Sequence, residues 1–447
     1  MRRLVEAAAP GTQLPSVREL TRRHRASPLT VQRIVTRLEQ EGLVRAEPGR
    51  GTFVAERGPA PVLDPGWQTL ALGARGLPAV ALADLLAPAP TGAIPLATGY
   101  PDPSLQALGL LATATARAAR RPDAWSRVPV EGTPELRAWF AREVGGGADP
   151  ADVLVTPGGQ AALATAMRAL ASPGDPVLVE SPTYIGALEA ARLAGLRAVP
   201  LPTDAGGVRP DALERALAAT GASLVVLQPL VANPTGATLA ADRREQVLGL
   251  LRDAGAFCVE DDYARDLVDP AVAPRPLWCD DADGHVVYVR SLTKSVAPGL
   301  RICGVLARGP AGERLRNTRL VDDFFVSGVL QETAVGVVTA PGWRRHLGQL
   351  RQALAARVDA AVDGIGRWEG AHLVTRPLGG FVLWVRLPDH HDDVAVATEA
   401  LRRGVVVSPG RRWFAAEPTG SFVRLSVAAA EVAQVRRALG VLARLSG

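Results

Sequence analysis

A single lysine, Lys294, stands in a chain of 447 residues whose 49 other basic positions are all arginine. Lysine offers a primary amine that can lose its proton and attack a carbonyl group, which a guanidinium cannot do. Ser291 and Thr293 precede it, and Arg301 follows seven residues later. The alternative is that one lysine survived by chance in a composition biased towards arginine. The polar neighbours favour a lysine that bonds covalently to a carbonyl ligand.

Short apolar runs rich in branched residues precede Lys294, and each leads into a polar cluster. The runs are 153–155, 177–179, 224–227, 257–259 and 286–289. They are bounded by turn residues and alternate with alanine-rich helical patterns, which predicts a parallel sheet covered on both faces. Ligands of such sheets bind beyond the carboxyl ends of the strands. The clusters expected to meet there are Thr156–Ala162, Glu180–Tyr184, Ala232–Gly236, Glu260–Tyr263 and Ser291–Ser295.

These clusters contain the types of group that pyridoxal 5'-phosphate (PLP) requires. Gly158 and Gly159 open a predicted helix, where free backbone amides bind an anion, although a glycine pair is more often only a turn. Tyr184 offers a ring that can stack on a pyridine. The buried carboxylates of 260–262 need a cationic partner, and a protonated pyridine nitrogen is one. Together with the amine of Lys294 and a cation for the phosphate, these groups form the set that holds PLP.

From about residue 95 to residue 447, the order and spacing of these clusters resemble class I aminotransferases of fold type I. The resemblance implies catalytic roles for Lys294, which carries PLP, for Asp261, which pairs with the pyridine nitrogen, and for Tyr263. It implies that further contacts to PLP come from Tyr184, Asn233, Gly158, Gly159, Gln160, Ser291, Arg301 and Tyr263. The stretch 422–426 matches the segment whose arginine binds a substrate carboxylate, which assigns Arg424 to substrate binding.

One position departs from the pattern of this family. Before a Gly-x-Pro-x-Leu-Arg stretch, which is 132–137 here, these enzymes usually carry a tyrosine that reaches the PLP phosphate of the partner subunit. Arg127 or a neighbour stands at that place in this chain. We expect that Arg127 binds the phosphate or that the contact is absent. A site of this type usually lies at a two-fold interface, which implies a homodimer.

The N-terminal segment differs in charge from the rest of the chain. Residues 1–57 hold eleven arginines and six acidic residues, so the net charge of +5 of the chain falls in this segment. Ser16 and Ser27 stand where two helices are predicted to begin, and Pro28 takes the first position of the second. A hairpin with a basic turn at 48–51 follows. This order predicts a winged helix-turn-helix that binds DNA, the alternative being a three-helix interaction module.

The runs 14–19 and 30–33 and the ending EGLVRAEPGRGTFVA (41–55) closely resemble the GntR family of bacterial regulators, and the resemblance covers residues 1–56. It implies DNA contacts by Arg18, Thr30, Arg33, Arg50 and Gly51. The segment before residue 14 is short for this family. We therefore expect that its first helix is truncated or that the true start codon lies upstream.

Between the two regions, residues 57–94 are rich in proline, glycine and alanine, which predicts a semi-rigid linker with short helical pieces at 67–72 and 80–86. The whole layout resembles the MocR subgroup of regulators. The predicted fold is therefore multidomain: a small α+β winged helix-turn-helix (1–56) followed by an α/β PLP-dependent transferase of fold type I (95–447). The latter should have a mostly parallel central sheet in a large subdomain (about 112–325) and a smaller α+β subdomain (about 340–447).

The resemblance implies a PLP-dependent transcriptional regulator that binds operator DNA and senses an amino compound or PLP itself. The alternative is an aminotransferase between amino acids and 2-oxo acids that carries an accessory DNA-binding domain. Other PLP chemistry, such as decarboxylation or β-elimination, is disfavoured by Arg424. No apolar run reaches the roughly 18 to 20 residues of a membrane span, and no secretory signal is expected. The three cysteines lack metal-ligand spacing, so we expect no metal and a reduced, cytoplasmic setting.

Overall fold

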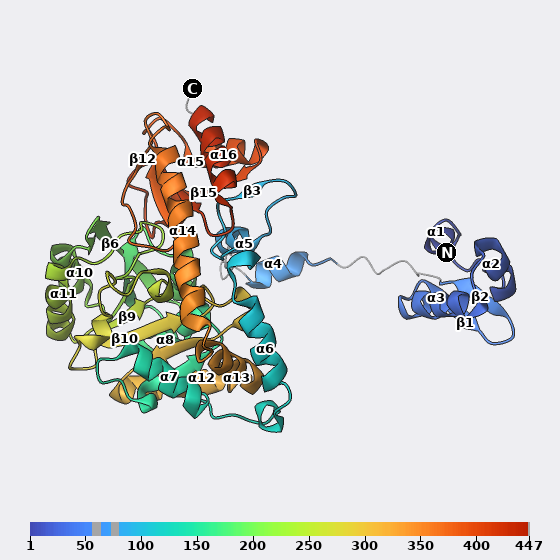
Figure 1. Cartoon of the computed structure of the whole chain (residues 1–447), viewed down its shortest axis with the longest axis horizontal. Helices are drawn as coiled ribbons and strands as arrows, with labels where there is room; N and C mark the ends of the chain where they lie inside the picture. Colours follow the sequence, from blue (N-terminus) through green and yellow to red (C-terminus); the bar gives the residue numbers. More distant parts are fainter. Residues whose placement is uncertain (56–63, 73–79, 446–447) are drawn as a thin grey trace. The chain divides into compact units, whose positions relative to one another are not determined.

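The structure is a computed structural model, and it describes residues 1–55, 64–72 and 80–445 (Figure 1). Contacts between residues divide the chain into two compact units, 1–76 and 77–447. Residues 56–63 and 73–79 lie outside the described residues, and all of them except residue 56 belong to the predicted linker. The two units are described separately below.

The N-terminal unit contains the predicted pair of helices and hairpin. Its elements are α1 (Arg2–Glu6), α2 (Val17–His24), α3 (Pro28–Gln40), β1 (Val44–Glu47), β2 (Gly51–Val54) and α4 (Gly66–Leu72). Both serine caps are present, since the Ser16 hydroxyl accepts the amide of Glu19 at 3.3 Å and the Ser27 hydroxyl accepts that of Thr30 at 3.2 Å. Strands β1 and β2 pair antiparallel, with Val44 opposite Val54. The winged helix-turn-helix is thus confirmed.

The small core of this unit is narrower than the sequence predicts. Val31, Val35 and Leu38 of α3 are buried, and Leu20 of α2 packs against the first two. The sequence spaces Val31, Ile34, Val35 and Leu38 as one apolar stripe of this helix, but Ile34 is 36% exposed. Ile34 lies at the edge of the stripe. The neighbouring elements no longer cover the helix there, so its side chain is partly exposed to solvent.

The large part of the C-terminal unit is a sheet of eight strands covered by helices. The strands are β4 (Val153–Thr156), β5 (Pro176–Ser181), β6 (Arg197–Asp204), β7 (Gly207–Val208), β8 (Leu224–Leu227), β9 (Phe257–Asp261), β10 (Val286–Ser291) and β11 (Cys303–Leu306). They are ordered β4-β11-β10-β9-β8-β5-β6-β7. The central neighbours pair in parallel, whereas β11 runs antiparallel to β10 and β4, and β7 to β6. The mostly parallel sheet is confirmed.

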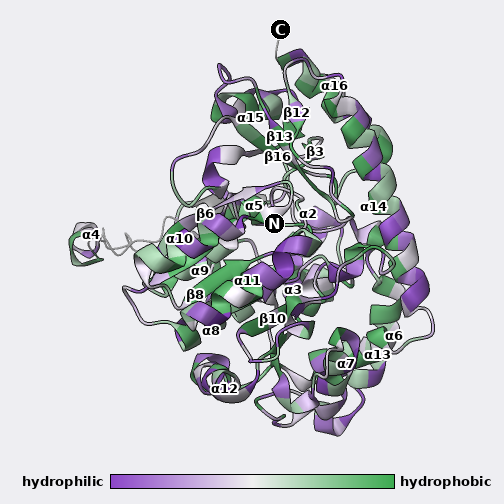
Figure 2. Cartoon of the chain, turned by 90° about the vertical axis from the view of Figure 1, so that its left-hand side faces the viewer, coloured by the Kyte–Doolittle hydropathy of each residue, from purple (hydrophilic) through white to green (hydrophobic). Residues whose placement is uncertain are grey.

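Helices cover both faces of this sheet. They are α6 (Leu108–Ala118), α7 (Pro134–Val144), α8 (Gly159–Leu170), α9 (Ile185–Leu193), α10 (Pro210–Thr220), α11 (Ala241–Ala254), α12 (Gly309–Asp323) and α13 (Gly328–Val338). Alternate residues of a strand enter opposite cores. Val225 of β8 packs in the cluster with α7, α10 and α11, while its neighbour Val226 packs with α8, α9 and α12. Strands buried on both faces read as continuous apolar runs, and Figure 2 shows β8 in the hydrophobic colour.

A smaller subdomain follows on the long helix α14 (Trp343–Ile365). Its sheet has the order β12-β13-β16-β15, all antiparallel. Its elements are β12 (His372–Leu373), β13 (Val382–Arg386), α15 (Asp393–Arg402), β14 (Val405–Val406), β15 (Ser408–Pro409), β16 (Phe422–Ser426) and α16 (Val432–Leu442). This subdomain agrees with the predicted second, α+β part.

Two pieces of the predicted linker pack onto the C-terminal unit. Strand β3 (Ile94–Pro95) pairs in parallel with β14. Helix α5 (Val80–Leu86) packs against α9. Both pieces bury apolar residues there, with Ile94 only 4% exposed and Leu85 packed against an aromatic cluster. These contacts could not be predicted from the proline-rich composition. Such a composition indicates a connecting segment, but it does not indicate what the apolar residues of that segment pack against.

Within the described ranges, no helix is both long and apolar enough to cross a membrane. The same residues contain no group of histidine, cysteine and acidic side chains arranged to hold a metal ion. Cys258, Cys279 and Cys303 are free, and the first and last of them are buried.

Candidate functional site

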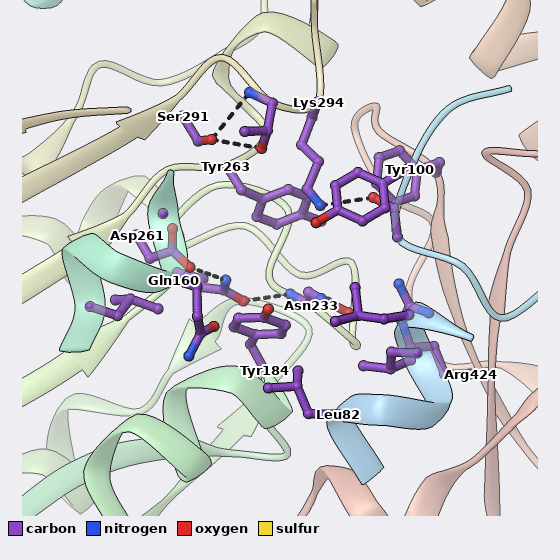
Figure 3. A pocket seen from close by; sticks show the side chains of 18 of the residues that line it. Leu82, Tyr100, Gln160, Tyr184, Asn233, Asp261, Tyr263, Ser291, Lys294 and Arg424 are labelled. Carbon is purple, nitrogen blue, oxygen red and sulfur yellow. Dashed lines mark hydrogen bonds between the residues drawn. The ribbon is translucent and has the colours of Figure 1, made fainter. Parts of the chain in front are cut away.

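The residues predicted to bind PLP meet in one cavity (Figure 3). All of them line it except Gly158, which directly precedes the lining residue Gly159 and lies against Arg301. Asp261 ends β9 and Ser291 ends β10, so these groups stand at the carboxyl edge of the sheet, as the parallel topology requires.

Lys294 projects into this cavity from the loop after β10. Its Nζ donates to the carbonyl oxygen of Gly99 at 2.9 Å and lies 3.8 Å from the ring centre of Tyr100. Burial lowers the pKa of Lys294 to about 7, and the cations Arg424 and Arg301 act in the same direction, while Asp261 opposes them. Near neutral pH, the amine is therefore about half uncharged, which is the form that attacks a carbonyl.

A buried ionic network fixes the loop that carries the lysine. Asp266 accepts from Arg290 at 2.7 Å and from the hydroxyl of Ser295 at 2.7 Å. The backbone oxygen of Asp266 accepts from Arg351 at 2.9 Å, and a ring nitrogen of His346 lies 2.7 Å from the backbone oxygen of Ser295. Arg351 and His346 belong to α14. The lysine loop is thus anchored to the helix that leads into the smaller subdomain.

The two neighbouring aspartates at the end of β9 have different partners. Asp262 pairs with Arg265 at 2.6 Å and accepts from the Tyr288 hydroxyl at 2.8 Å. Asp261 faces the cavity, and among the described residues its side chain accepts from one neutral donor, the side-chain amide of Gln228 at 2.7 Å. Burial raises the pKa of Asp261 to about 6, and Asp262 adds to the rise. A buried carboxylate without a cation fits a ligand that brings one, and a pyridinium nitrogen does so.

Gln228 was not predicted from the sequence, yet it joins three parts of the site. Its side chain donates to Asp261, its side-chain oxygen accepts from the backbone amide of Asn233 at 2.8 Å, and its own backbone amide donates to Glu180 at 2.7 Å. Burial raises the pKa of Glu180 to about 7. The residue follows β8 directly, so its position after a strand was the available signal, but its type alone carried no specific chemistry.

An anion cradle forms where α8 begins. Gly158 has φ of +97°, which disfavours any residue with a side chain, and a Cβ there would lie 2.4 Å from Nη2 of Arg301 and displace the guanidinium. Arg301 donates to the carbonyl oxygen of Pro157 at 3.0 Å. The hydroxyls of Ser291 and Thr293 lie 2.8 Å apart beside it. A helix N-terminus, two hydroxyls and a guanidinium suit a phosphate group.

The groups between the cradle and the smaller subdomain also face the cavity. The Gln160 amide nitrogen donates to the Gly186 carbonyl oxygen at 2.8 Å, and its buried side-chain oxygen has no partner among the described residues. The Tyr263 hydroxyl donates to the carbonyl oxygen of Val231 at 2.8 Å, which leaves its oxygen able to accept. Asn233 accepts from Arg424 through Oδ1, so its amide hydrogens remain for a ligand. Tyr184 also lines this cavity (Figure 3).

Arg424 is buried without a carboxylate partner among the described residues. Only 1% of it is exposed, and it donates to Asn233 at 2.9 Å and to the carbonyl oxygen of Ala97 at 2.9 Å. Its guanidinium lies 4.7 Å from a ring centre of Trp413. Burial lowers the pKa of Arg424 to about 10. A buried, unpaired cation is costly, so this position suits an anionic group of a ligand.

The sequence assigned no contact with the ligand or cofactor to several of the lining residues. They are Tyr100, Thr293, Phe381, Trp413 and the leucines 82, 85 and 86 of α5. Apart from Thr293, each lies in a segment that is distant in sequence from the polar clusters, so only the fold brings it to the cavity. Arg127, which stands where the family carries a tyrosine, is exposed and does not line the cavity of its own chain.

The predicted DNA-contacting residues lie at the surface of the N-terminal unit. Arg18 on α2, Thr30 and Arg33 on α3, and Arg50 and Gly51 on the hairpin are all exposed. Gly51 has φ of +122°, and a Cβ there would lie 2.5 Å from the Gln13 amide nitrogen, which itself donates to the Arg50 carbonyl oxygen at 2.6 Å. The hairpin turn therefore requires glycine at this position.

A winged helix-turn-helix joined in one chain to a fold type I domain, whose cofactor is PLP, defines a PLP-dependent transcriptional regulator. Residues 95–442 match the family model "Aminotransferase class I and II", and residues 3–54 match "Bacterial regulatory proteins, gntR family". The chain belongs to the class I and II aminotransferase family through its C-terminal domain and carries a GntR-type DNA-binding domain at its N-terminus.

Relatives and solved structures agree with this composition. The chain is 29% identical to the uncharacterized HTH-type transcriptional regulator YjiR of Escherichia coli K12, over 94% of this chain and 90% of YjiR. It is 29% identical to the vitamin B6 salvage pathway transcriptional repressor PtsJ of Salmonella typhimurium, over 91% and 87%. Its fold matches LysN, the α-aminoadipate aminotransferase of Thermus thermophilus, with a TM-score of 0.78 and 28% identity, covering 84% of this chain and 97% of LysN.

Proposed function

We propose that the C-terminal domain of this regulator is a sensor, in which PLP held on Lys294 binds an amino compound and thereby changes the affinity of the winged helix-turn-helix for its operator. One observation carries the proposal: the only lysine in the sequence faces a cavity that also contains the carboxylate of Asp261 and the guanidinium of Arg424, neither of which has an ion-pair partner among the described residues. That cavity belongs to the same chain as a basic DNA-binding domain.

Each cavity residue has a role in this proposal. Lys294 bonds covalently to the PLP aldehyde, and Asp261 keeps the pyridine nitrogen protonated, so the ring can withdraw electrons from whatever amine it carries. Tyr184 packs on the ring, and Tyr263 and Asn233 bind its phenolic oxygen. The phosphate is held at the start of α8 by Gly158, Gly159, Gln160, Ser291 and Arg301.

The ligand supplies the groups that pair with the charged side chains of the cavity. Its amino group replaces Lys294 at the cofactor, and its carboxylate binds Arg424, which keeps N–H donors on both terminal nitrogens for a bidentate contact. Trp413 supports the guanidinium from behind. The released lysine amine, with its lowered pKa, can then hold or move a proton beside Tyr100.

The DNA-binding surface is proposed to consist of Arg18, Thr30, Arg33, Arg50 and Gly51. The exposed face of α3 carries Gln32, Arg33, Thr36 and Arg37, as expected of a helix that enters the major groove of DNA. We further propose a cytoplasmic homodimer, whose two DNA-binding domains read two operator half-sites. Ligand binding then shifts the dimer between two populations that differ in operator affinity.

Transamination is the second candidate function, because the cavity contains every group that the reaction needs. The solved structure of LysN holds N-(5'-phosphopyridoxyl)-L-leucine, a product of joining the cofactor to an amino acid. The first half of a transamination transfers the amino group of the ligand to the cofactor. A protein that carries out only this half-reaction could still act as a sensor. Sustained turnover with a 2-oxo acid is what would make the protein primarily an enzyme.

The test compares operator affinity in three states of the full-length protein: without PLP, with PLP, and with PLP and an amino compound. Turnover with a 2-oxo acid is measured in parallel. The proposal predicts that operator affinity changes between the second and third states while turnover remains slow, below about one per minute against a typical enzyme value of about ten per second. Unchanged operator affinity together with rapid turnover would establish the enzyme instead.

A further inference from the structure

Helix α5 lies in the stretch that the sequence marks as a linker, yet it forms one wall of the ligand cavity. Leu82, Leu85 and Leu86 all line the cavity. Their spacing of three and four residues places them on one face of the helix. Figure 3 shows Leu82 projecting from this helix towards Tyr184, the residue proposed to pack on the cofactor ring. The wall therefore lies on the ligand side of the PLP position.

Two contacts hold α5 against the C-terminal unit. Leu85 packs against an aromatic cluster built around Trp384, Trp413 and Phe422. Asp84 forms an ion pair with Arg412, which directly precedes Trp413 in the chain. Both partners of the pair are partly exposed, so its contribution is small. The position of α5 thus depends mainly on apolar packing next to the residue that supports Arg424.

Each charged side chain that lines the cavity already has a proposed partner on the cofactor or on the ligand. Among the described residues, these side chains are Asp261, Lys294, Arg301 and Arg424. The first three serve the cofactor, and Arg424 serves the ligand carboxylate. On the α5 side the described lining residues are the three leucines and Trp413, which shares an aromatic cluster with Leu85. A second carboxylate on the ligand would meet no cation of its own chain there, whereas an apolar side chain would be removed from water.

We infer that α5 is the element that determines side-chain specificity, and that the ligand is an α-amino acid with an apolar side chain. The inference rests on the proposed function, because it takes the amino group to lie at Lys294 and the carboxylate at Arg424. Selection follows from the leucine face, which offers contact area to a hydrocarbon chain and no partner to a charge. A segment between the DNA-binding and cofactor-binding domains thus takes part in ligand recognition.

The experiment titrates the full-length, PLP-loaded protein with L-norleucine, L-2-aminoadipate and L-alanine, following the visible absorption of the lysine-bound cofactor. Norleucine and 2-aminoadipate have side chains of similar length that end in a methyl group and a carboxylate, respectively. We expect norleucine to bind at least about tenfold more tightly than 2-aminoadipate, since an uncompensated polar end in an apolar pocket is strongly rejected. Alanine reports on the amine and carboxylate sites alone.

Two arginine substitutions on the same helix test the role of α5. Leu82→Arg places a cation in the wall and should reverse the preference towards 2-aminoadipate. Ala83→Arg adds the same charge at an exposed neighbouring position that does not line the cavity, and should leave the preference unchanged. Leu82→Ala, a milder change, should weaken norleucine binding by about tenfold while alanine affinity is retained.

The outcomes separate this inference from the function on which it rests. If alanine binds but norleucine and 2-aminoadipate bind equally well to the native protein, the inference about α5 is wrong and the proposed function stands. Equal effects of Leu82→Arg and Ala83→Arg would also overturn it. If none of the three amino acids perturbs the cofactor absorption, the proposed amino-compound site itself fails, and the inference fails with it.

Discussion

In the winged helix-turn-helix, Arg18, Arg33 and Arg50 are exposed to solvent, and Arg50 pairs with an acidic neighbour at the surface. In the PLP-binding domain, Asp261 and Arg424 are buried, and the pKa of Lys294 falls to about 7. The same kinds of charge therefore act in two environments. Exposed charges act over about a Debye length and weaken with salt, whereas buried charges bind a specific partner at short range.

This contrast assigns a different kind of recognition to each unit. A DNA-binding surface gains affinity from many phosphate contacts, none of which is indispensable. A buried site gains specificity because each unsatisfied charge excludes ligands that do not match it. Substitutions in the cavity should therefore have large, ligand-specific effects, while those on the DNA-binding surface should have smaller effects that depend on salt.

The largest expected effect follows substitution of the only lysine. Lys294→Arg keeps the positive charge but removes the nucleophile, so PLP should bind weakly and without a covalent bond. Borohydride reduction followed by mass spectrometry should fix the cofactor on the native protein and not on the variant. Retention of the same visible absorption band by the variant would show that the assignment of Lys294 is wrong.

A smaller but still large effect is expected at Arg424. Arg424→Ala should weaken binding of an amino acid by about 30- to 1,000-fold, because a desolvated bidentate pair contributes about 2 to 4 kcal/mol. Covalent attachment of PLP should remain. The matched control is an amine without a carboxylate, whose affinity should change little. Equal losses for both ligands would place the carboxylate elsewhere.

The lowered pKa of Lys294 predicts how cofactor attachment depends on pH. Only the neutral amine attacks the aldehyde, and with a pKa of about 7 its fraction rises from about one tenth at pH 6 to about nine tenths at pH 8. The initial rate of covalent attachment to PLP-free protein should rise with pH in the same range and level off above it. A midpoint near pH 10 would mean that the lysine is not desolvated.

On the DNA-binding surface, Arg33→Ala should reduce operator affinity by roughly three- to tenfold at moderate salt and lower the slope of log affinity against log salt by about 0.9, as expected for loss of one phosphate contact. Arg345→Ala, on the exposed side of α14, serves as the control and should change neither quantity. An unchanged salt slope in Arg33→Ala would mean that this side chain does not contact a phosphate.

The smallest expected effect concerns the ion pair that helps to hold α5. Asp84→Ala should weaken the binding of an apolar amino acid by less than about fivefold, because a partly exposed pair contributes at most about 1 kcal/mol. Arg412→Ala should have a similar effect, and the double variant should be no weaker than either single variant. Fully additive losses would show that the two side chains act independently.

Most of the residues predicted to bind the cofactor end a strand or lie a few residues beyond one, and parallel strands end at one edge of the sheet. The sequence therefore indicates that Asp261, Ser291 and the glycines of 158–159 lie close together, and the structure brings them to one cavity. Gln228 and Trp413 could not be predicted in this way, since neither type of residue indicates PLP chemistry by itself. The side of the cavity formed by α5 was missed for a different reason: proline-rich composition describes how stiff a segment is, not what it packs against.

The central claim is that an amino compound bound in the buried PLP site changes the affinity of the exposed DNA-binding surface for its operator. One titration tests this claim most directly. An amino acid that shifts the cofactor absorption is added to holo-protein mixed with labelled operator DNA, so both signals come from the same sample. The account predicts that operator affinity changes along the same saturation curve as the absorption, and that Arg424→Ala moves both curves to higher ligand concentration together. Saturation of the absorption change with constant operator affinity would contradict it.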